Sequence, residues 1–212
     1  MNIKLELIYG LSLVSLAGCG GSASKSGESK QAKTQPNVIF IVADDLGYGD
    51  MSCYGAHRIS TPNVDRLASD GLRFTDAHAV ASTSTPSRYS LFTGLYSWRR
   101  NDTGIATGDA GMVIRPEQTT VADIFKSAGY TTGAIGKWHL GMGAEAGTQD
   151  WNGTVTPGPG DLGFDYSYLM AATGDRVPCV WMENQKVANY DPSAPISVSY
   201  KEPFPGEPLG KD

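Results

Sequence analysis

The sequence predicts an α/β fold, and three observations lead to that prediction. Residues 38–43 form a continuous apolar, β-branched run, typical of a strand that is buried on both faces. Residues 121–128 have apolar residues at helical spacing and are followed by a glycine. Residues 130–136 return to a strand-like pattern. Strand, helix and strand in alternation favour an α/β domain.

The elements between these points have recognisable end signals. Thr61 and Pro62 precede an apolar helical pattern that ends before Gly71, which predicts a helix, and residues 72–74 are predicted as a short second strand. Residues 87–92 suit the first turns of a helix that begins at Ser84. From Thr148 onward glycine, proline and turn residues dominate, and we assign no element there.

The composition limits the size and the partners of the protein. The chain has 212 residues, 40% of them hydrophobic, which is enough for one sizeable core and not clearly for two. The formal net charge of -5 argues against a nucleic-acid partner, since such a partner requires a basic face.

The N-terminus has the pattern of a targeting segment. Lys4 precedes a short apolar run at residues 7–16, which falls short of the ~20 apolar residues that span a bilayer. The run ends in Leu16-Ala17-Gly18-Cys19, which is similar to the bacterial lipobox. We therefore predict a signal peptide at residues 1–18 and an exported lipoprotein in the periplasm or at the cell surface, attached to a membrane through a lipid on Cys19.

Residues 19–35 contain almost no apolar side chain and are predicted to be a flexible tether, so the globular part runs from 36 to 212. With Cys19 assigned to the lipid, Cys53 and Cys179 remain. They either pair in an oxidising compartment or stay as two free thiols.

Two adjacent carboxylates, Asp44 and Asp45, follow the first predicted strand. Carboxylates at the end of a buried strand repel each other unless a cation offsets them, and their hard oxygens suit Ca²⁺ or Mg²⁺. The alternative for an Asp-Asp pair is a turn or a helix cap.

A second motif runs from Ser84 through Pro86 and Arg88 to Thr93 and Gly94. An unmodified serine is a poor nucleophile without a base, and its ordinary role at this place is a helix N-cap. Arg88 offers planar cationic donors that suit an anionic site, and its alternative is a surface position on the helix.

A third motif, at residues 136–141, places Lys137 and His139 after the predicted strand. A lysine there can offset negative charge in a transition state, and a histidine can transfer a proton. The alternative is a solvated loop with a structural histidine. In residues 174–179, Asp175 and Arg176 either contact substrate or form a surface ion pair, and we predict the ion pair.

These three motifs, in this order, resemble those of the formylglycine-dependent sulfatases, in the serine-type form of the arylsulfatase-like bacterial members. The resemblance implies an alkaline-phosphatase-like domain with a mixed central sheet flanked by helices, of which residues 36–212 are the N-terminal part. It implies hydrolysis of sulfate esters of aryl compounds or carbohydrates, so the expected substrate is a sulfated small molecule or glycan.

The resemblance also assigns roles to the site residues. Ser84 is oxidised to formylglycine by a maturation enzyme; one hydroxyl of its hydrate attacks sulfur, and the second expels sulfate as the aldehyde re-forms. Arg88 holds this group, Lys137 bridges it and a sulfate oxygen, and His139 helps to remove its proton. Asp44, Asp45 and the Ser84 position are expected to ligate Ca²⁺, or alternatively Mg²⁺.

The remaining metal ligands, a second histidine and a second lysine are expected beyond Asp212, so we expect the 212 residues alone to be inactive. Two alternative functions remain open. One is a phosphate or phosphonate ester hydrolase of the same superfamily. The other is a non-catalytic lipoprotein that binds sulfated glycans.

Overall fold

The computed structural model describes residues 35–199 and 203–206. The predicted signal peptide, Cys19 and the tether as far as residue 34 lie outside these residues. Chain contacts divide the protein into two units, residues 1–42 and 43–212. Within the described part, no helix is both long and apolar enough to cross a bilayer.

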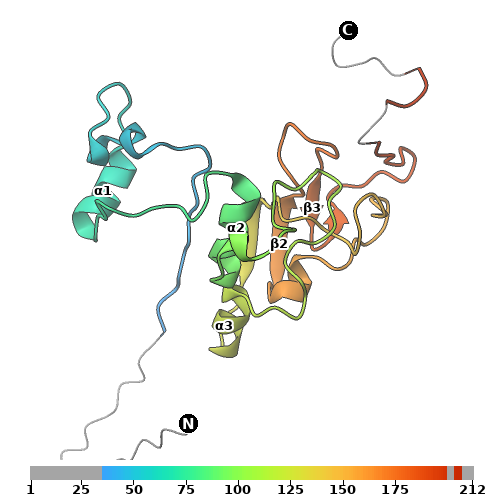
Figure 1. The fold of residues 1–212 in the computed structure, drawn as a ribbon, viewed down its shortest axis with the longest axis horizontal. Coiled ribbons are helices and arrows are strands. Elements are labelled where there is room, and N and C mark those ends of the chain that lie inside the picture. Colours follow the sequence, from blue (N-terminus) through green and yellow to red (C-terminus); the bar gives the residue numbers. More distant parts are fainter. Residues whose placement is uncertain (1–34, 200–202, 207–212) are drawn as a thin grey trace, which may run out of the picture. The chain divides into compact units, whose positions relative to one another are not determined.

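A mixed four-stranded sheet forms the framework of residues 43–212, as the fold prediction expected (Figure 1). Its strands are β1 (Gly133–Lys137), β2 (Tyr166–Met170), β3 (Trp181–Glu183) and β4 (Lys186–Val187), in that spatial order. β1 and β2 are parallel, whereas β3 runs antiparallel to both of its neighbours, β2 and β4. The carboxyl ends of β1 and β2 therefore lie at the same edge of the sheet, where parallel sheets bind ligands.

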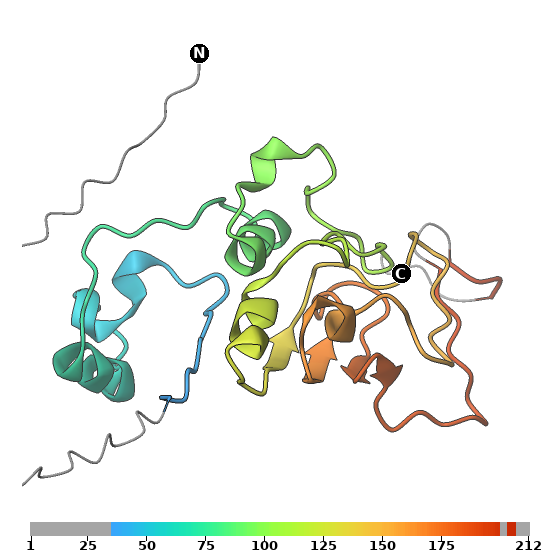
Figure 2. The same cartoon turned by 90° about the horizontal axis from the view of Figure 1, so that it is seen from below.

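Three α-helices occur where the sequence predicts them: α1 (Pro62–Asp70), α2 (Ser84–Thr93) and α3 (Val121–Ser127). α2 and α3 pack against each other beside the sheet (Figures 1 and 2). α2 ends at Gly94, whose φ of 68° is left-handed and whose N–H donates to the Ser90 carbonyl at 2.8 Å. α3 begins with a capping box between Thr120 and Asp123.

Short 3₁₀ turns complete the secondary structure. They are η1 (Tyr48–Asp50), η2 (Ser52–Tyr54), η3 (Ser97–Arg99) and η4 (Pro159–Leu162). Thr61 stands at the N-cap position of α1 as predicted, but its hydroxyl bonds the side chains of Ser52 and Asp65 and no backbone N–H of the helix. The start of α1 is therefore tied to η2.

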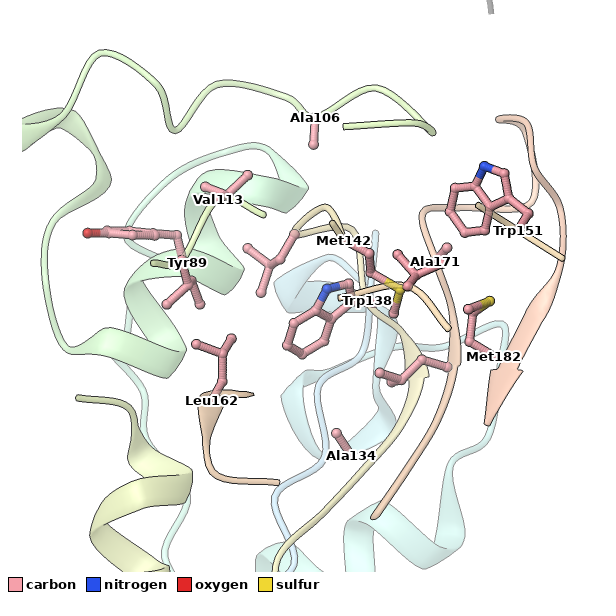
Figure 3. Packing of buried hydrophobic residues seen from close by; sticks show 14 residues of the cluster. Tyr89, Ala106, Val113, Ala134, Trp138, Met142, Trp151, Leu162, Ala171 and Met182 are labelled. Carbon is pink, nitrogen blue, oxygen red and sulfur yellow. The ribbon is translucent and has the colours of Figure 1, made fainter. Parts of the chain in front are cut away.

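The core of the domain surrounds Trp138, which lies just after β1 and is 1% exposed (Figure 3). Its ring contacts those of Phe92 and Phe164, with centroids 5.6 and 6.2 Å away. Its indole N–H donates to the Gly141 carbonyl at 2.8 Å, so the buried polar group is satisfied. This packing holds the segment after β1, which carries the third motif, against α2 and the sheet.

The predicted strand at 38–43 is wrong, because these residues form no ladder. Ile39 and Ile41 are 84% and 79% exposed. An apolar run becomes a buried strand only when neighbouring strands pair with it, and no described strand does so.

The predicted strand at 72–74 is also wrong: Leu72 is 87% exposed and the segment is irregular. The strand predicted at 130–136 exists but begins later, as β1. β2, β3 and β4 all lie in the region to which we assigned no element. Cys53 and Cys179 are both free thiols, half-buried and exposed respectively.

Candidate active site

The first turn of α2 holds the first pair of predicted site residues together. Ser84 is the first residue of the helix, and Arg88 lies one turn later on the same face. The Arg88 Nε donates to the Ser84 Oγ at 3.0 Å. Ser84 is thus inside the helix, and the N-cap position that we considered for it belongs to Thr83.

The Arg88 guanidinium connects α2 with the end of β1. Its side chain is only 11% exposed, so it is not the surface arginine of the alternative reading. One Nη donates to the Lys137 carbonyl at 2.8 Å, and the other lies 3.6 Å from an Asp44 carboxylate oxygen. Burial lowers the pKa of Arg88, and the Asp44 carboxylate acts in the opposite direction.

Asp44 lies between two cations. Lys137 Nζ donates to one of its carboxylate oxygens, and Arg88 approaches the other. The hydrogen bond from Lys137 lowers the pKa of Asp44 against the opposing effect of burial, and the charges of Lys137 and Arg88 lower it further. The structure thus joins Ser84, Arg88, Lys137 and Asp44 in one network that spans three segments of the chain.

Asp45 lies outside this network. Its φ of 55° is left-handed, unusual for a residue with a side chain, and it is exposed. Among the described residues, its carboxylate has no hydrogen-bond or ion-pair partner.

His139, two residues after Lys137 in the chain, is buried, with 2% of its surface exposed and a left-handed φ of 54°. Its Nε2 lies 3.0 Å from the Ala106 carbonyl and 2.7 Å from Arg176 Nη1. Its Nδ1 is buried and has no hydrogen-bond partner among the described residues. Burial lowers the pKa of His139, as do the charges of Lys137, Arg176 and Arg88, although the Ala106 carbonyl opposes them.

Thr85 connects the two halves of the site. It follows Ser84 in α2 and is 0% exposed. Its hydroxyl donates to the His139 carbonyl at 2.8 Å and accepts from the Ala106 N–H at 3.1 Å. Thr85 therefore bonds the helix that carries Ser84 to the segment that carries His139, beside the bond that Arg88 makes to the Lys137 carbonyl.

Arg176 is a member of the site that the sequence did not identify. We predicted that it forms an ion pair with Asp175, but none of the ion pairs of the described residues involves Arg176; it bonds Ala106 and His139 instead. It follows β2, as His139 follows β1. Recognition of β2 as a strand parallel to β1 would have indicated that both segments lie at one edge of the sheet.

The donors present suit a hard divalent cation in type but do not form a complete set. Asp44, Asp45 and Ser84 offer carboxylate and hydroxyl oxygens, as Ca²⁺ and Mg²⁺ prefer. A carboxylate has about four lone-pair positions, so the contacts of Asp44 with Lys137 and Arg88 leave it able to accept a further partner. Within residues 35–199 and 203–206, however, no group of three or more acidic, histidine or cysteine side chains could hold a metal.

Comparison with known proteins identifies relatives of most of the chain. The family model described as Sulfatase matches residues 36–180. An N-acetylgalactosamine-6-O-sulfatase of Bacteroides thetaiotaomicron is 49% identical over 208 residues, which are 98% of this chain and 40% of the relative. Human arylsulfatase A is 47% identical over 111 residues, 52% of this chain and 22% of the relative.

Solved structures also match this chain. A Bacteroides thetaiotaomicron structure from work on the metabolism of multiple glycosaminoglycans matches with a TM-score of 0.80 and 51% identity, over 84% of this chain and 37% of that one. Ps i-CgsB in complex with a neocarrahexaose matches with a TM-score of 0.60 and 28% identity, over 74% of this chain and 38% of that one. This chain therefore spans about 40% of the length of the curated Bacteroides relative.

Proposed function

This chain belongs to the sulfatase family, and from that premise we propose that it supplies the nucleophile side of an enzyme that hydrolyses sulfate esters. The observation that carries the proposal is the network of Ser84, Arg88, Lys137 and Asp44, because it gathers a modifiable residue and two cations in one place. Such an arrangement suits an anionic ester whose negative charge increases in the transition state.

The nucleophile that we propose is formylglycine made from Ser84 by a maturation enzyme. This group, when present, supplies a hydrated aldehyde with two hydroxyls on one carbon. Support comes from the placement of Ser84 in the first turn of α2, where Arg88 already bonds its oxygen at 3.0 Å. Arg88 is buried and bonded at both ends, so it holds the oxygen of this side chain in a fixed position.

Lys137 and Arg88 together bind the sulfate group and offset its charge. Asp44 holds both cations through the two oxygens of one carboxylate, which orients them without neutralising both. His139 takes part as a neutral imidazole, because burial and three nearby cations disfavour its protonated form.

We also propose that a divalent metal, Ca²⁺ or alternatively Mg²⁺, binds at Asp44, Asp45 and the Ser84 oxygen, where it would act as a Lewis acid. Hard oxygen donors support this choice. The left-handed backbone at Asp45 supports it as well, since strained backbone clusters at ligand sites.

For the substrate we propose a sulfated carbohydrate. The support is the 49% identity to the Bacteroides protein named N-acetylgalactosamine-6-O-sulfatase, which extends over nearly the whole chain. Export as a lipoprotein through Cys19 would place the enzyme where such glycans occur. Incorporation of labelled fatty acid that is lost in Cys19→Ala would support the anchor, and labelling that persists in that variant would contradict it.

The experiment that tests the function weighs the peptide that contains Ser84. The protein is expressed with and without a formylglycine-generating enzyme and digested. A peptide lighter by two hydrogen atoms only in the presence of that enzyme supports the proposal. Ser84→Ala must abolish the mass change, whereas Ser69→Ala, at an exposed position on α1, must leave it intact.

An unmodified Ser84 under these conditions would contradict the nucleophile and favour either direct serine chemistry on phosphate esters or a glycan-binding protein. A sulfate ester and a phosphate ester of the same phenol, assayed side by side with the matured full-length enzyme, separate these two alternatives from each other and from the sulfatase.

A further inference from the structure

Arg176 makes two short contacts through one nitrogen. Its Nη1 lies 2.7 Å from the Ala106 carbonyl oxygen and 2.7 Å from His139 Nε2. A guanidinium nitrogen donates hydrogen bonds and accepts none. Both contacts are therefore donated by Arg176, one to the carbonyl and one to the imidazole.

These contacts determine where the ring proton of His139 lies. If Nε2 carried the proton, two donors would face each other at 2.7 Å. Nε2 must instead accept through its lone pair, and a neutral imidazole with a bare Nε2 carries its proton on Nδ1. The Ala106 carbonyl, 3.0 Å from Nε2, is the acceptor that the opposite tautomer would use, and it takes its shorter hydrogen bond, at 2.7 Å, from Arg176.

We propose that Arg176 is a positioning residue that fixes His139 in the tautomer with its proton on Nδ1. The backbone of His139 is fixed independently of Arg176, because its carbonyl accepts from Thr85 and its N–H donates to the Ala171 carbonyl. Arg176 thus selects which ring nitrogen remains available. The two residues are 37 positions apart in the sequence and meet only because β1 and β2 are parallel neighbours.

With its proton on Nδ1, His139 has a different role in the reaction from the one expected, and that role rests on the proposed function. Nδ1 is buried and has no partner among the described residues, so its N–H is the group left to meet a bound ligand. As a donor, it stabilises negative charge on an oxygen of the reacting ester. Removal of a proton, the role expected from the resemblance, would require a lone pair on this atom.

Nitrogen NMR of the histidine rings tests the assignment without any need for activity. The chain has three histidines, and the other two, His57 and His78, are exposed. We expect the ¹⁵N-labelled protein at neutral pH to show a protonated Nδ1 and a bare Nε2 for His139. A protonated Nε2, or a fully charged ring, would overturn the proposal.

Three variants then test whether Arg176 is the cause. Arg176→Met removes both donated bonds, so the proton is expected to move to Nε2 and bond the freed Ala106 carbonyl. Arg176→Lys keeps a cationic donor and should retain the Nδ1 tautomer in a larger share of molecules. Arg99→Met, a matched change at an exposed arginine, should leave the spectrum unchanged. An unchanged His139 spectrum in a folded Arg176→Met protein would refute the role of Arg176.

Kinetics of the matured full-length enzyme, which includes these residues, distinguish positioning from substrate binding on a sulfate ester. The positioning role predicts that Arg176→Met lowers kcat by about 10²-fold, the lower end of the effect of losing one hydrogen-bond donor to developing negative charge, with KM changed by no more than about twofold. A raised KM with unchanged kcat would identify Arg176 as a sulfate contact and overturn the proposal. If the matured full-length wild-type enzyme cleaves no sulfate ester, the proposed function fails, and the ring spectrum still decides the tautomer.

Discussion

Replacement of Thr85 by valine tests the link between the two halves of the site. Valine has nearly the shape of threonine, so the change removes the hydroxyl and little else. The hydroxyl is fully buried and makes two bonds, at 2.8 Å to the His139 carbonyl and at 3.1 Å to the Ala106 N–H. Both backbone groups belong to buried residues, and no other described residue forms a hydrogen bond with them.

The expected loss follows from those two orphaned groups. Leaving one buried polar group without its partner costs about 1–3 kcal/mol. Two such groups lower the free energy of unfolding by about 2–6 kcal/mol, a large share of the stability of a domain, which is typically about 5–15 kcal/mol. The control is Thr85→Ser, which keeps the hydroxyl and loses only a methyl group, at a cost of about 1 kcal/mol.

Urea unfolding followed by tryptophan fluorescence measures both variants, since Trp138 lies in the core. The midpoint should fall further for valine than for serine, with the slope of each transition unchanged. A loss below about 1 kcal/mol for valine, or a larger loss for serine than for valine, would show that the hydroxyl does not hold the site together.

Two further predictions concern ionisation. Burial first, then the charges of Lys137, Arg176 and Arg88, lower the pKa of His139, so the unfolded chain binds its proton more readily than the folded one. This contribution to the free energy of unfolding should be fully present above the unfolded pKa of about 6.5 and should decrease as the pH falls below it. The His139→Gln variant should lack this decrease. A free energy of unfolding that does not change between pH 8 and 5 would contradict the prediction. Asp165 has a pKa of about 2, chiefly because Lys126 donates to it at 2.7 Å, so Lys126→Met should raise this pKa toward 3.8 in an NMR titration. An unchanged value would assign the shift to Thr132 instead.

The three α-helices could be predicted because their signals are local. Proline at the start of α1, glycine after α2 and the Thr120 cap of α3 act within one helical turn, so the sequence contains the whole cause. The short strands β3 and β4, with three and two residues, could not be predicted, because so few positions show no periodicity.

The apolar run at 38–43 is the reverse case, a predicted strand that the structure does not contain. Its composition predicts a buried strand, yet a strand exists only through hydrogen bonds to neighbours, which composition does not specify. The same reasoning explains Arg176: its place in a glycine-flanked loop indicated a surface ion pair, whereas the parallel pairing of β1 and β2 brings it to His139.

The sequence by itself identified the candidate site residues: Ser84, Arg88, Lys137, His139 and the Asp44-Asp45 pair stand in motifs whose order and spacing are properties of the chain. Only the tertiary structure decided how they act on one another. It placed one Asp44 carboxylate between two cations, separated Asp45 from them, and set Arg176 against the His139 ring. The physical reason is that a motif involves neighbours in sequence, whereas electrostatic effects depend on neighbours in space. The state of a buried ionisable group depends on every charge and dipole that the fold brings within a few ångströms.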